Sequence, residues 1–192
     1  IKIPAFVRTM LLVGIPTKAA LTGIVSFAVP LLLAERGVSK ESIGQVLMSY
    51  AAIVLLVSHK VGPWVDRLGN SKTVLSLGNF IAGLALILLA IGLAMPQNWQ
   101  TVVVMTLAMM MMGFSHGLIN APVVTHVVVS MAESQEPDSV IAATYRFLER
   151  FGHVSGSVLV GQLLIWFGAE HAMLVLAGFF VAACVLFTIC GQ

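Results

Sequence analysis

The sequence predicts an all-α polytopic membrane protein with six membrane-spanning helices, and two observations carry this prediction. The first is composition, because 59% of the 192 residues are hydrophobic and only 9% are charged, whereas soluble domains carry about 25% charged residues. The second is the spacing of the few polar breaks, which leaves apolar segments of about 20 residues or more, the length that crosses a bilayer. We therefore expect a single six-helix membrane domain over residues 1–192.

The six segments follow one another with short connections. The first covers about residues 5–34 and ends at the polar run ERGVSKES; the second covers residues 43–65. The third covers residues 73–94 and ends at the uncharged MPQNW, and the acidic ESQEPD follows the fourth, residues 99–131. The fifth covers residues 139–167 and the sixth covers residues 172–190, and the run GAEH separates them. Connections this short force neighbouring helices to run antiparallel.

The basic residues near the segment ends predict the orientation. The side that holds the N-terminus and the 2–3 and 4–5 loops carries Lys2, Arg8, Lys60, Arg67, Lys72, Arg146 and Arg150, whereas the other side carries Arg36 and Lys40. Because cytoplasmic loops carry the excess of Lys and Arg, we expect the N-terminus in the cytoplasm, and an integral protein of a bacterial inner membrane. Trp64, Trp99 and Trp166 lie near segment ends, where interfacial aromatic residues gather.

The loop after the second segment, VGPWVDRLGNSK at residues 61–72, is unusually polar for this chain. Gly62 permits close approach of another helix, and Gly69 suits a sharp reversal of the backbone. Asp66 can accept hydrogen bonds from the free amides at a neighbouring helix N-terminus, and Lys72 can do the converse for a carboxylate. A polar loop that only joins two helices accounts for this composition equally well.

The spacing Gly62-x-x-x-Asp66-Arg67-x-Gly69-x-x-Lys72 resembles the loop motif GxxxDRxGRR of major facilitator superfamily transporters. In that family the motif lies between helices two and three and recurs, weaker, between helices eight and nine. The resemblance implies that Asp66 and Arg67 help to close the cytoplasmic side and release it during alternating access. Asn70 and Ser71 stand where a basic pair is usual, a departure that is more typical of the second copy of the motif.

Two further stretches resemble the same family. GIPTKAALTGIVSFAVPLLL, residues 14–33, is similar to helix seven, and YRFLERFGHVSGSVLVGQLL, residues 145–164, is similar to helix eleven, with Gly152, Gly156 and Gly161 along it. The resemblance covers essentially the whole chain and implies helices seven to twelve, the C-terminal half of such a transporter. The chain begins at Ile1 rather than Met, so we expect a piece of something longer, completed by a second six-helix half or by a copy of itself.

Lys18 is the best candidate for a substrate or proton site. A charge near the bilayer centre costs about 2.5–3.5 kcal/mol, and Lys18 lies roughly 20 Å into the first segment at 1.5 Å per residue. Pro16, two residues earlier, removes a backbone donor and loosens the helix locally. The alternative is a pairing inside the bundle that only fixes helix packing.

His116 and Asn120 are four residues apart, just before Pro122, so they share a helix face near the middle of the membrane. They can offer hydrogen bonds to a ligand, or His116 can carry protons. A hydrogen bond between helices is the commoner explanation for such residues. Asn79, a single polar residue in the third segment, is expected to pack rather than to bind.

Arg146, Glu149, Arg150 and His153 share one face of the fifth segment, where Glu149 can pair with Arg146. Counting 20 residues back from Trp166 puts Arg146 at the cytoplasmic interface, so Arg146, Glu149 and Arg150 are predicted to act in a cytoplasmic gate. Charges that reach back to lipid headgroups explain the same pattern.

The leading functional hypothesis is a secondary transporter that holds a small organic solute near the midplane, between this half and its partner. With Lys18 as the only deep charge and no deep carboxylate expected, an anionic or neutral solute is favoured over a cation, and a proton-coupling Asp or Glu is not expected in this half. The alternative is a membrane sensor or anchor module of a signalling protein, without transport.

Other classes are excluded or disfavoured by what the sequence lacks. No Ser-His-Asp grouping, metal-ligand spacing or phosphate loop is present, so we expect neither an enzyme nor a cofactor or metal. Cys184 and Cys190 share no helix face and carry no disulfide signal. A net charge of +2 without a basic run gives no reason to expect a nucleic-acid partner. The expected partners are a small-molecule substrate, the lipid bilayer and the second half.

Overall fold

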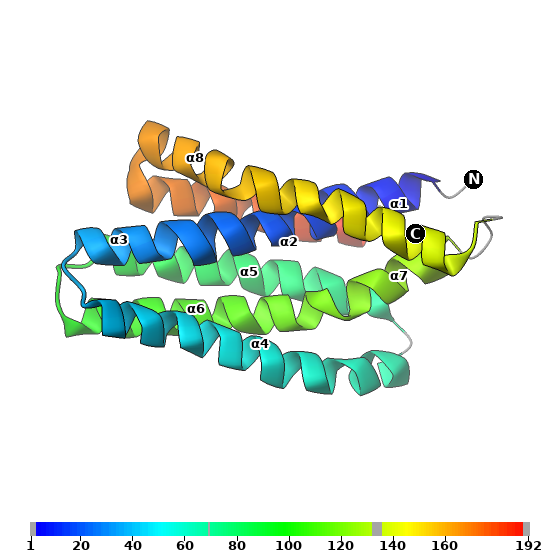
Figure 1. Ribbon diagram of the computed structural model, residues 1–192, viewed down its shortest axis with the longest axis horizontal. Helices are drawn as coiled ribbons and strands as arrows, with labels where there is room; N and C mark the ends of the chain where they lie inside the picture. Colours follow the sequence, from blue (N-terminus) through cyan, green and yellow to red (C-terminus); the bar gives the residue numbers. More distant parts are fainter. Residues whose placement is uncertain (1–2, 69, 132–135, 190–192) are drawn as a thin grey trace.

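The computed structural model describes residues 3–68, 70–131 and 136–189, and every regular element among them is a helix. The helices run along the long axis of the molecule, and the N-terminal helix starts at the same end at which the last helix finishes (Figure 1). Among the described residues, five helices are long and apolar enough to cross a membrane, and the last has the length for two crossings. The predicted all-α membrane bundle is confirmed.

The first span is one continuous helical rod made of five pieces. They are α1 (Ile3–Thr9), the π-helical η1 (Met10–Gly14), α2 (Ile15–Ala20), the π-helical η2 (Leu21–Ala28) and α3 (Val29–Glu35). Wide π turns arise where the ordinary hydrogen-bond ladder is interrupted, and Pro16 and Pro30 each lack an N–H to donate. We call this element the N-terminal rod.

A side chain of a neighbouring helix compensates the first of these interruptions. In an α-helix the N–H of residue 16 would bond the carbonyl of Leu12, but proline has no N–H. The Nδ2 of Asn79 donates to the Leu12 carbonyl oxygen instead, at 3.0 Å. Asn79 is fully buried, so its place in the structure is a packing role between two helices.

The middle spans are α4 (Lys40–Leu68), α5 (Ser71–Ala94) and α6 (Trp99–Asn120), and α6 continues into α7 (Pro122–Ser130). Asn70 and Asn98 cap α5 and α6, since their side chains accept hydrogen bonds from the amides of Thr73 and Thr101, both at 3.1 Å. A side-chain oxygen at this position satisfies an amide that has no partner in the helix. The predicted fourth segment is therefore two helices in line, interrupted just before Pro122.

The last span, α8 (Asp138–Ile189), is 52 residues long and bends back on itself. Gly168 has φ 74° and ψ 169°, and only glycine takes such a positive φ without a steric penalty. The first arm, residues 138–167, and the second arm, residues 169–189, correspond to the predicted fifth and sixth segments. The break is Gly168 alone, because residues 169–171 of the predicted GAEH break are already helical.

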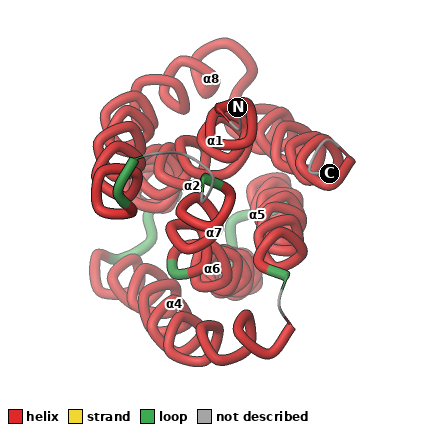
Figure 2. Tube along the Cα trace, turned by 90° about the vertical axis from the view of Figure 1, so that its right-hand side faces the viewer, coloured by secondary structure: helices red, strands yellow, loops and turns green. Residues whose placement is uncertain are grey.

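α5 lies at the centre of the packing, against α6 and α8, while α4 packs mainly against α6. In the end view α4 lies at one edge of the bundle, on the side opposite the N-terminus (Figure 2). In their most apolar stretches 61% of α5 is buried but only 11% of α4. The exposed flank of α4 carries large apolar side chains, among them Met48, Leu55 and Leu56.

Glycines set the closest helix contacts. A Cβ at Gly152 would collide with the Ile15 carbonyl, and one at Gly156 would collide with the Ala19 carbonyl of the N-terminal rod. Small residues allow such approaches between membrane helices. Gly62 differs, because a Cβ there would meet no described atom within 4 Å. The close approach expected at Gly62 does not occur among the described residues, since this end of α4 lies at the periphery.

Candidate substrate site and cytoplasmic gate

Three polar side chains from three different helices meet at Lys18. The Lys18 ammonium, on α2, donates a hydrogen bond to Oδ1 of Asn120 at 3.0 Å. The same ammonium lies 3.8 Å from Oε2 of Glu149, on the first arm of α8. We call Lys18, Asn120 and Glu149 the central cluster.

The local structure explains why these groups meet. Gly152 lies one turn after Glu149, and a Cβ there would come 2.9 Å from the Cβ of Lys18. The absence of that side chain lets the N-terminal rod approach α8 closely and brings Glu149 within reach of Lys18. Asn120 is the last residue of α6, directly before the break at Pro122.

The central cluster corrects one expectation. No deep carboxylate was expected beside Lys18, because Glu149 was assigned to a gate nearer the cytoplasm. The structure shows the two side chains 3.8 Å apart, with only 16% of the Lys18 side chain and 13% of the Glu149 side chain exposed. Partly buried charges interact more strongly than fully exposed ones, so Lys18 and Glu149 balance each other's charge.

Arg146 is the second cation near Glu149, but its environment differs. Its Nη1 lies 3.9 Å from Oε1 of Glu149, the i, i+3 pairing that the spacing indicates, and 66% of the Arg146 side chain is exposed. Exposed ion pairs contribute little because water screens them. Glu149 also lines an open depression of about 440 Å³ together with Arg150, His153 and Val154. Glu149 thus lies between partly buried Lys18 and an open face of the bundle.

His116 contacts α4, whereas Asn120 contacts α2. Its Nδ1 lies 2.7 Å from the hydroxyl of Tyr50 on α4, and the two rings meet edge to face with centroids 5.7 Å apart. His116 is only 1% exposed, and its Nε2 has no hydrogen-bond partner among the described residues. One ring nitrogen therefore links two helices, and the other is left for a further partner.

The structure describes only part of the loop between α4 and α5. Gly69 lies outside the described residues, as do Cys190 and the side chains of Trp64, Asp66 and Arg67. Lys72 is half-buried and borders a shallow pocket with Asn70, Thr73 and Thr188, among others. The structure brings none of the described part of this loop to the central cluster.

Ser71 and His126 form a contact that sequence reasoning missed. The Ser71 hydroxyl lies 2.8 Å from Nδ1 of His126 on α7, and the His126 ring packs edge-on against Phe187. The contact joins the start of α5 to α7. A lone histidine in an apolar helix gives no local signal of its partner, so the sequence did not predict this contact.

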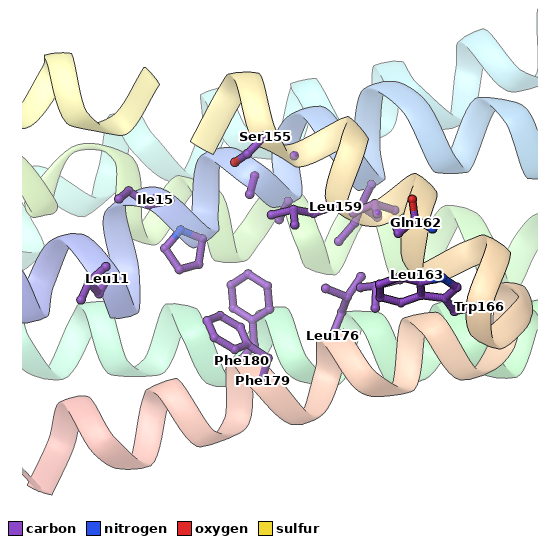
Figure 3. Close-up of a pocket in the computed structure, with 16 residues that line it drawn as sticks. Leu11, Ile15, Ser155, Leu159, Gln162, Leu163, Trp166, Leu176, Phe179 and Phe180 are labelled. Carbon is purple, nitrogen blue, oxygen red and sulfur yellow. The ribbon is translucent and has the colours of Figure 1, made fainter. Parts of the chain in front are cut away.

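A separate cavity of about 380 Å³ lies between the N-terminal rod and the two arms of α8 (Figure 3). Its lining is apolar apart from Ser155 and Gln162, and Trp166 and Phe179 form part of its walls. No member of the central cluster lines it. This cavity offers space without charged side chains in its lining.

The bundle and its central cluster define a class: a polytopic helical membrane protein with an ion pair inside its spans. A family model described as Major Facilitator Superfamily matches residues 12–190, so the chain belongs to the major facilitator superfamily. No curated protein matched the chain. The family assigns a transporter-type function, as the loop motif and the two helix stretches predicted.

Proposed function

We propose that this chain is the C-terminal half of a secondary transporter that moves a small organic solute, anionic or neutral, by alternating access. The observation that carries the proposal is the hydrogen bond of 3.0 Å between Lys18 and Asn120. It joins two spans at a point where each helix is interrupted, beside Pro16 and before Pro122. Transporters hold solutes at such discontinuous helices near the bilayer midplane.

The proposed substrate contacts are Lys18, Asn120 and His116. An ammonium offers three donors, of which one is used by Asn120, so Lys18 has donors left for the oxygens of a solute. The free Nε2 of His116 is a further polar group in the same part of the bundle. A buried polar group without a partner costs free energy, and a solute or a water that binds it removes that cost.

A second six-helix half is proposed to cover the exposed apolar flanks of this one. α4 is the least covered span, and on the first arm of α8 the side chains of Val154 and Val158 are exposed. Glu149 and the open depression lie on that same first arm. A partner half placed over α4 and this arm would enclose the solute between the two halves.

The gate is proposed at the end of the bundle that holds the N-terminus, with that end in the cytoplasm of a bacterial cell. Its residues would be those of the loop, Gly62, Asp66, Arg67, Gly69 and Lys72, together with Arg146, Glu149 and Arg150. The exposure of Arg146 supports a role at the surface of the bundle. The hydrogen bond between Ser71 and His126 gives this gate a contact between α5 and α7.

Reconstitution of the full protein into liposomes tests the proposal, with uptake measured for a library of small organic acids and neutral solutes. Lys18→Gln and Asn120→Ala should each reduce uptake at least about tenfold, because a hydrogen bond to a charged group is worth about 1.5–3 kcal/mol. Lys40→Gln is the matched control, since exposed Lys40 begins α4 and should transport like the wild type. Normal uptake by Lys18→Gln would contradict the proposed site.

A further inference from the structure

The apolar cavity between the N-terminal rod and the two arms of α8 has the shape of a site for one hydrocarbon chain (Figure 3). We infer that it holds an acyl chain of a membrane glycerophospholipid, with the ester end of that chain at Gln162 and Trp166. The described lining of the cavity includes none of the proposed substrate contacts. This site is therefore separate from the proposed transport of a solute and does not depend on it.

The dimensions of the cavity match one chain in one leaflet. Its walls run from Leu11 to Ile24 on the N-terminal rod and from Ser155 to Trp166 on the first arm, roughly 16–20 Å at 1.5 Å per residue. This length is a little more than half of a hydrocarbon core about 30 Å thick. A volume of about 380 Å³ over roughly 16–20 Å leaves a mean cross-section of roughly 19–24 Å². Non-bonded carbon atoms pack about 4 Å apart, so one chain fits this cross-section and two do not.

The two ends of the cavity differ in a way that orients the chain. Leu11 and Ile15 lie at one end, and Gln162 and Trp166 lie at the other (Figure 3). Trp166 comes two residues before the reversal at Gly168, and tryptophan gathers at membrane interfaces. The Gln162 amide is exposed and has no hydrogen-bond partner among the described residues, so it is able to donate to an ester carbonyl. The cavity thus runs from an interface to an apolar inner end.

The cavity opens on a flank of the bundle that differs from the one proposed for the second half. Leu11, Leu159 and Phe179 border it, and all three are exposed. The second half is proposed to cover Val154 and Val158. Val158 precedes Leu159 by one residue, so their side chains point roughly 100° apart around the helix. A lipid chain is therefore able to enter the cavity while the second half is in place.

Hydrocarbon is the occupant that the lining favours. Apolar cavities stay free of water, and an empty cavity leaves its lining atoms without contacts on one side. A chain from the surrounding lipid restores these contacts, and lipid tails are as apolar as leucine side chains. A polar solute would meet no charged side chain in the described lining. The Ser155 hydroxyl already donates to the Phe151 carbonyl of its own helix at 2.6 Å.

Native mass spectrometry of the full protein, released from nanodiscs of palmitoyl-oleoyl phosphatidylcholine, tests the site. The wild type should retain one phospholipid more than Leu176→Trp and Leu159→Trp, in which an indole fills the cavity. Leu174→Trp is the matched control, because Leu174 is exposed on the second arm and is not part of the cavity lining. This control should retain as much phospholipid as the wild type. The inference is overturned if either cavity variant, once folded, retains the wild-type amount.

Photolabelling of the wild type in vesicles identifies the occupant without a variant. A phosphatidylcholine with a diazirine at the end of one acyl chain should label half-buried Ile15, at the inner end. The same lipid with the diazirine beside the ester should label half-buried Leu163, next to Gln162. The reverse order would contradict the assigned direction. If the second half filled the cavity, neither lipid would label these residues, and the proposed occupant would be wrong.

A free fatty acid with the same terminal diazirine distinguishes the source of the chain. It should label Ile15 more weakly than the phospholipid at equal concentration, because its carboxylate would lie beside a wall without a charged side chain, and an unpaired charge there is unfavourable. Equal or stronger labelling would assign the cavity to free fatty acids and overturn the inference.

Gln162→Leu tests the ester end of the chain. Loss of one neutral hydrogen bond should weaken phospholipid retention about two- to tenfold. Ser155→Ala is the control, since the Ser155 hydroxyl serves its own helix, and it should leave retention unchanged. Wild-type retention by Gln162→Leu would show that the ester does not lie at Gln162, contrary to the inference.

Discussion

The hydroxyl of Ser71 and Nδ1 of His126 lie 2.8 Å apart and join the first turn of α5 to α7. Ser71 is one of the two residues that stand where the related loop motif has a basic pair. The other, Asn70, caps α5 through the amide of Thr73. The two departures from the motif therefore have structural roles, a helix cap and a contact between helices.

Ser71→Ala should lower the free energy of unfolding by about 0.5–1.5 kcal/mol, because it removes a neutral hydrogen bond and leaves a histidine nitrogen without its partner. Thermal unfolding of the purified full protein measures this loss. Ser130→Ala is the matched control, since among the described residues the Ser130 hydroxyl donates to the Val127 carbonyl of its own helix. Equal stability of the two variants would show that the contact with His126 contributes nothing.

The sequence alone was enough to predict an all-α membrane bundle and a break at the run that contains Gly168. Span length follows from the distribution of apolar residues, and the φ of 74° at Gly168 is a conformation that favours glycine. Both features are local, so one segment of the chain contains the information for each. The sequence predicts one long span over residues 99–131, whereas the structure interrupts this helix just before Pro122.

The sequence did not predict that Glu149 meets Lys18. Residue spacing shows which side chains share a face of one helix, but not which neighbour that face contacts. That choice depends on the close approach of the N-terminal rod at Gly152 and Gly156, which is a property of two helices together. The partners of His116 and Ser71, Tyr50 and His126, are more than 50 residues away along the chain and were missed for the same reason.

Gly156→Ala should destabilise the protein by about 1–3 kcal/mol, the cost of adding a methyl group to a closely packed interface. The added Cβ would collide with the Ala19 carbonyl and the Thr22 hydroxyl, and the N-terminal rod would have to move away from α8. Gly178→Ala on the second arm is the control, because a Cβ there meets nothing within 4 Å. That control should be neutral or slightly stabilising, as alanine favours helices, and melting temperatures would report both changes.

Tyr50→Phe removes the hydrogen bond between Tyr50 and His116 and should destabilise the protein by about 0.6 kcal/mol, and by at most about 1.7. Tyr50→Phe/His116→Phe should recover much of the loss, because replacing both partners by apolar groups leaves no buried nitrogen unsatisfied. If His116 also contacts the solute, the double variant regains stability but not uptake in liposomes. Recovery of both would assign His116 a structural role only.

Asn79→Ala leaves the Leu12 carbonyl without the side chain that compensates for Pro16 and should cost about 0.6–1.7 kcal/mol. Pro16→Ala supplies the missing backbone N–H, so Asn79→Ala should cost less in a Pro16→Ala background than in the wild type. A double-mutant cycle of unfolding free energies measures this coupling. Pro16 lies two residues from Lys18, so a Pro16 variant could change uptake either by altering the helix or by altering the proposed substrate contact. Unfolding free energy avoids this ambiguity. Strictly additive effects would show that Asn79 does not act through the carbonyl that Pro16 leaves free.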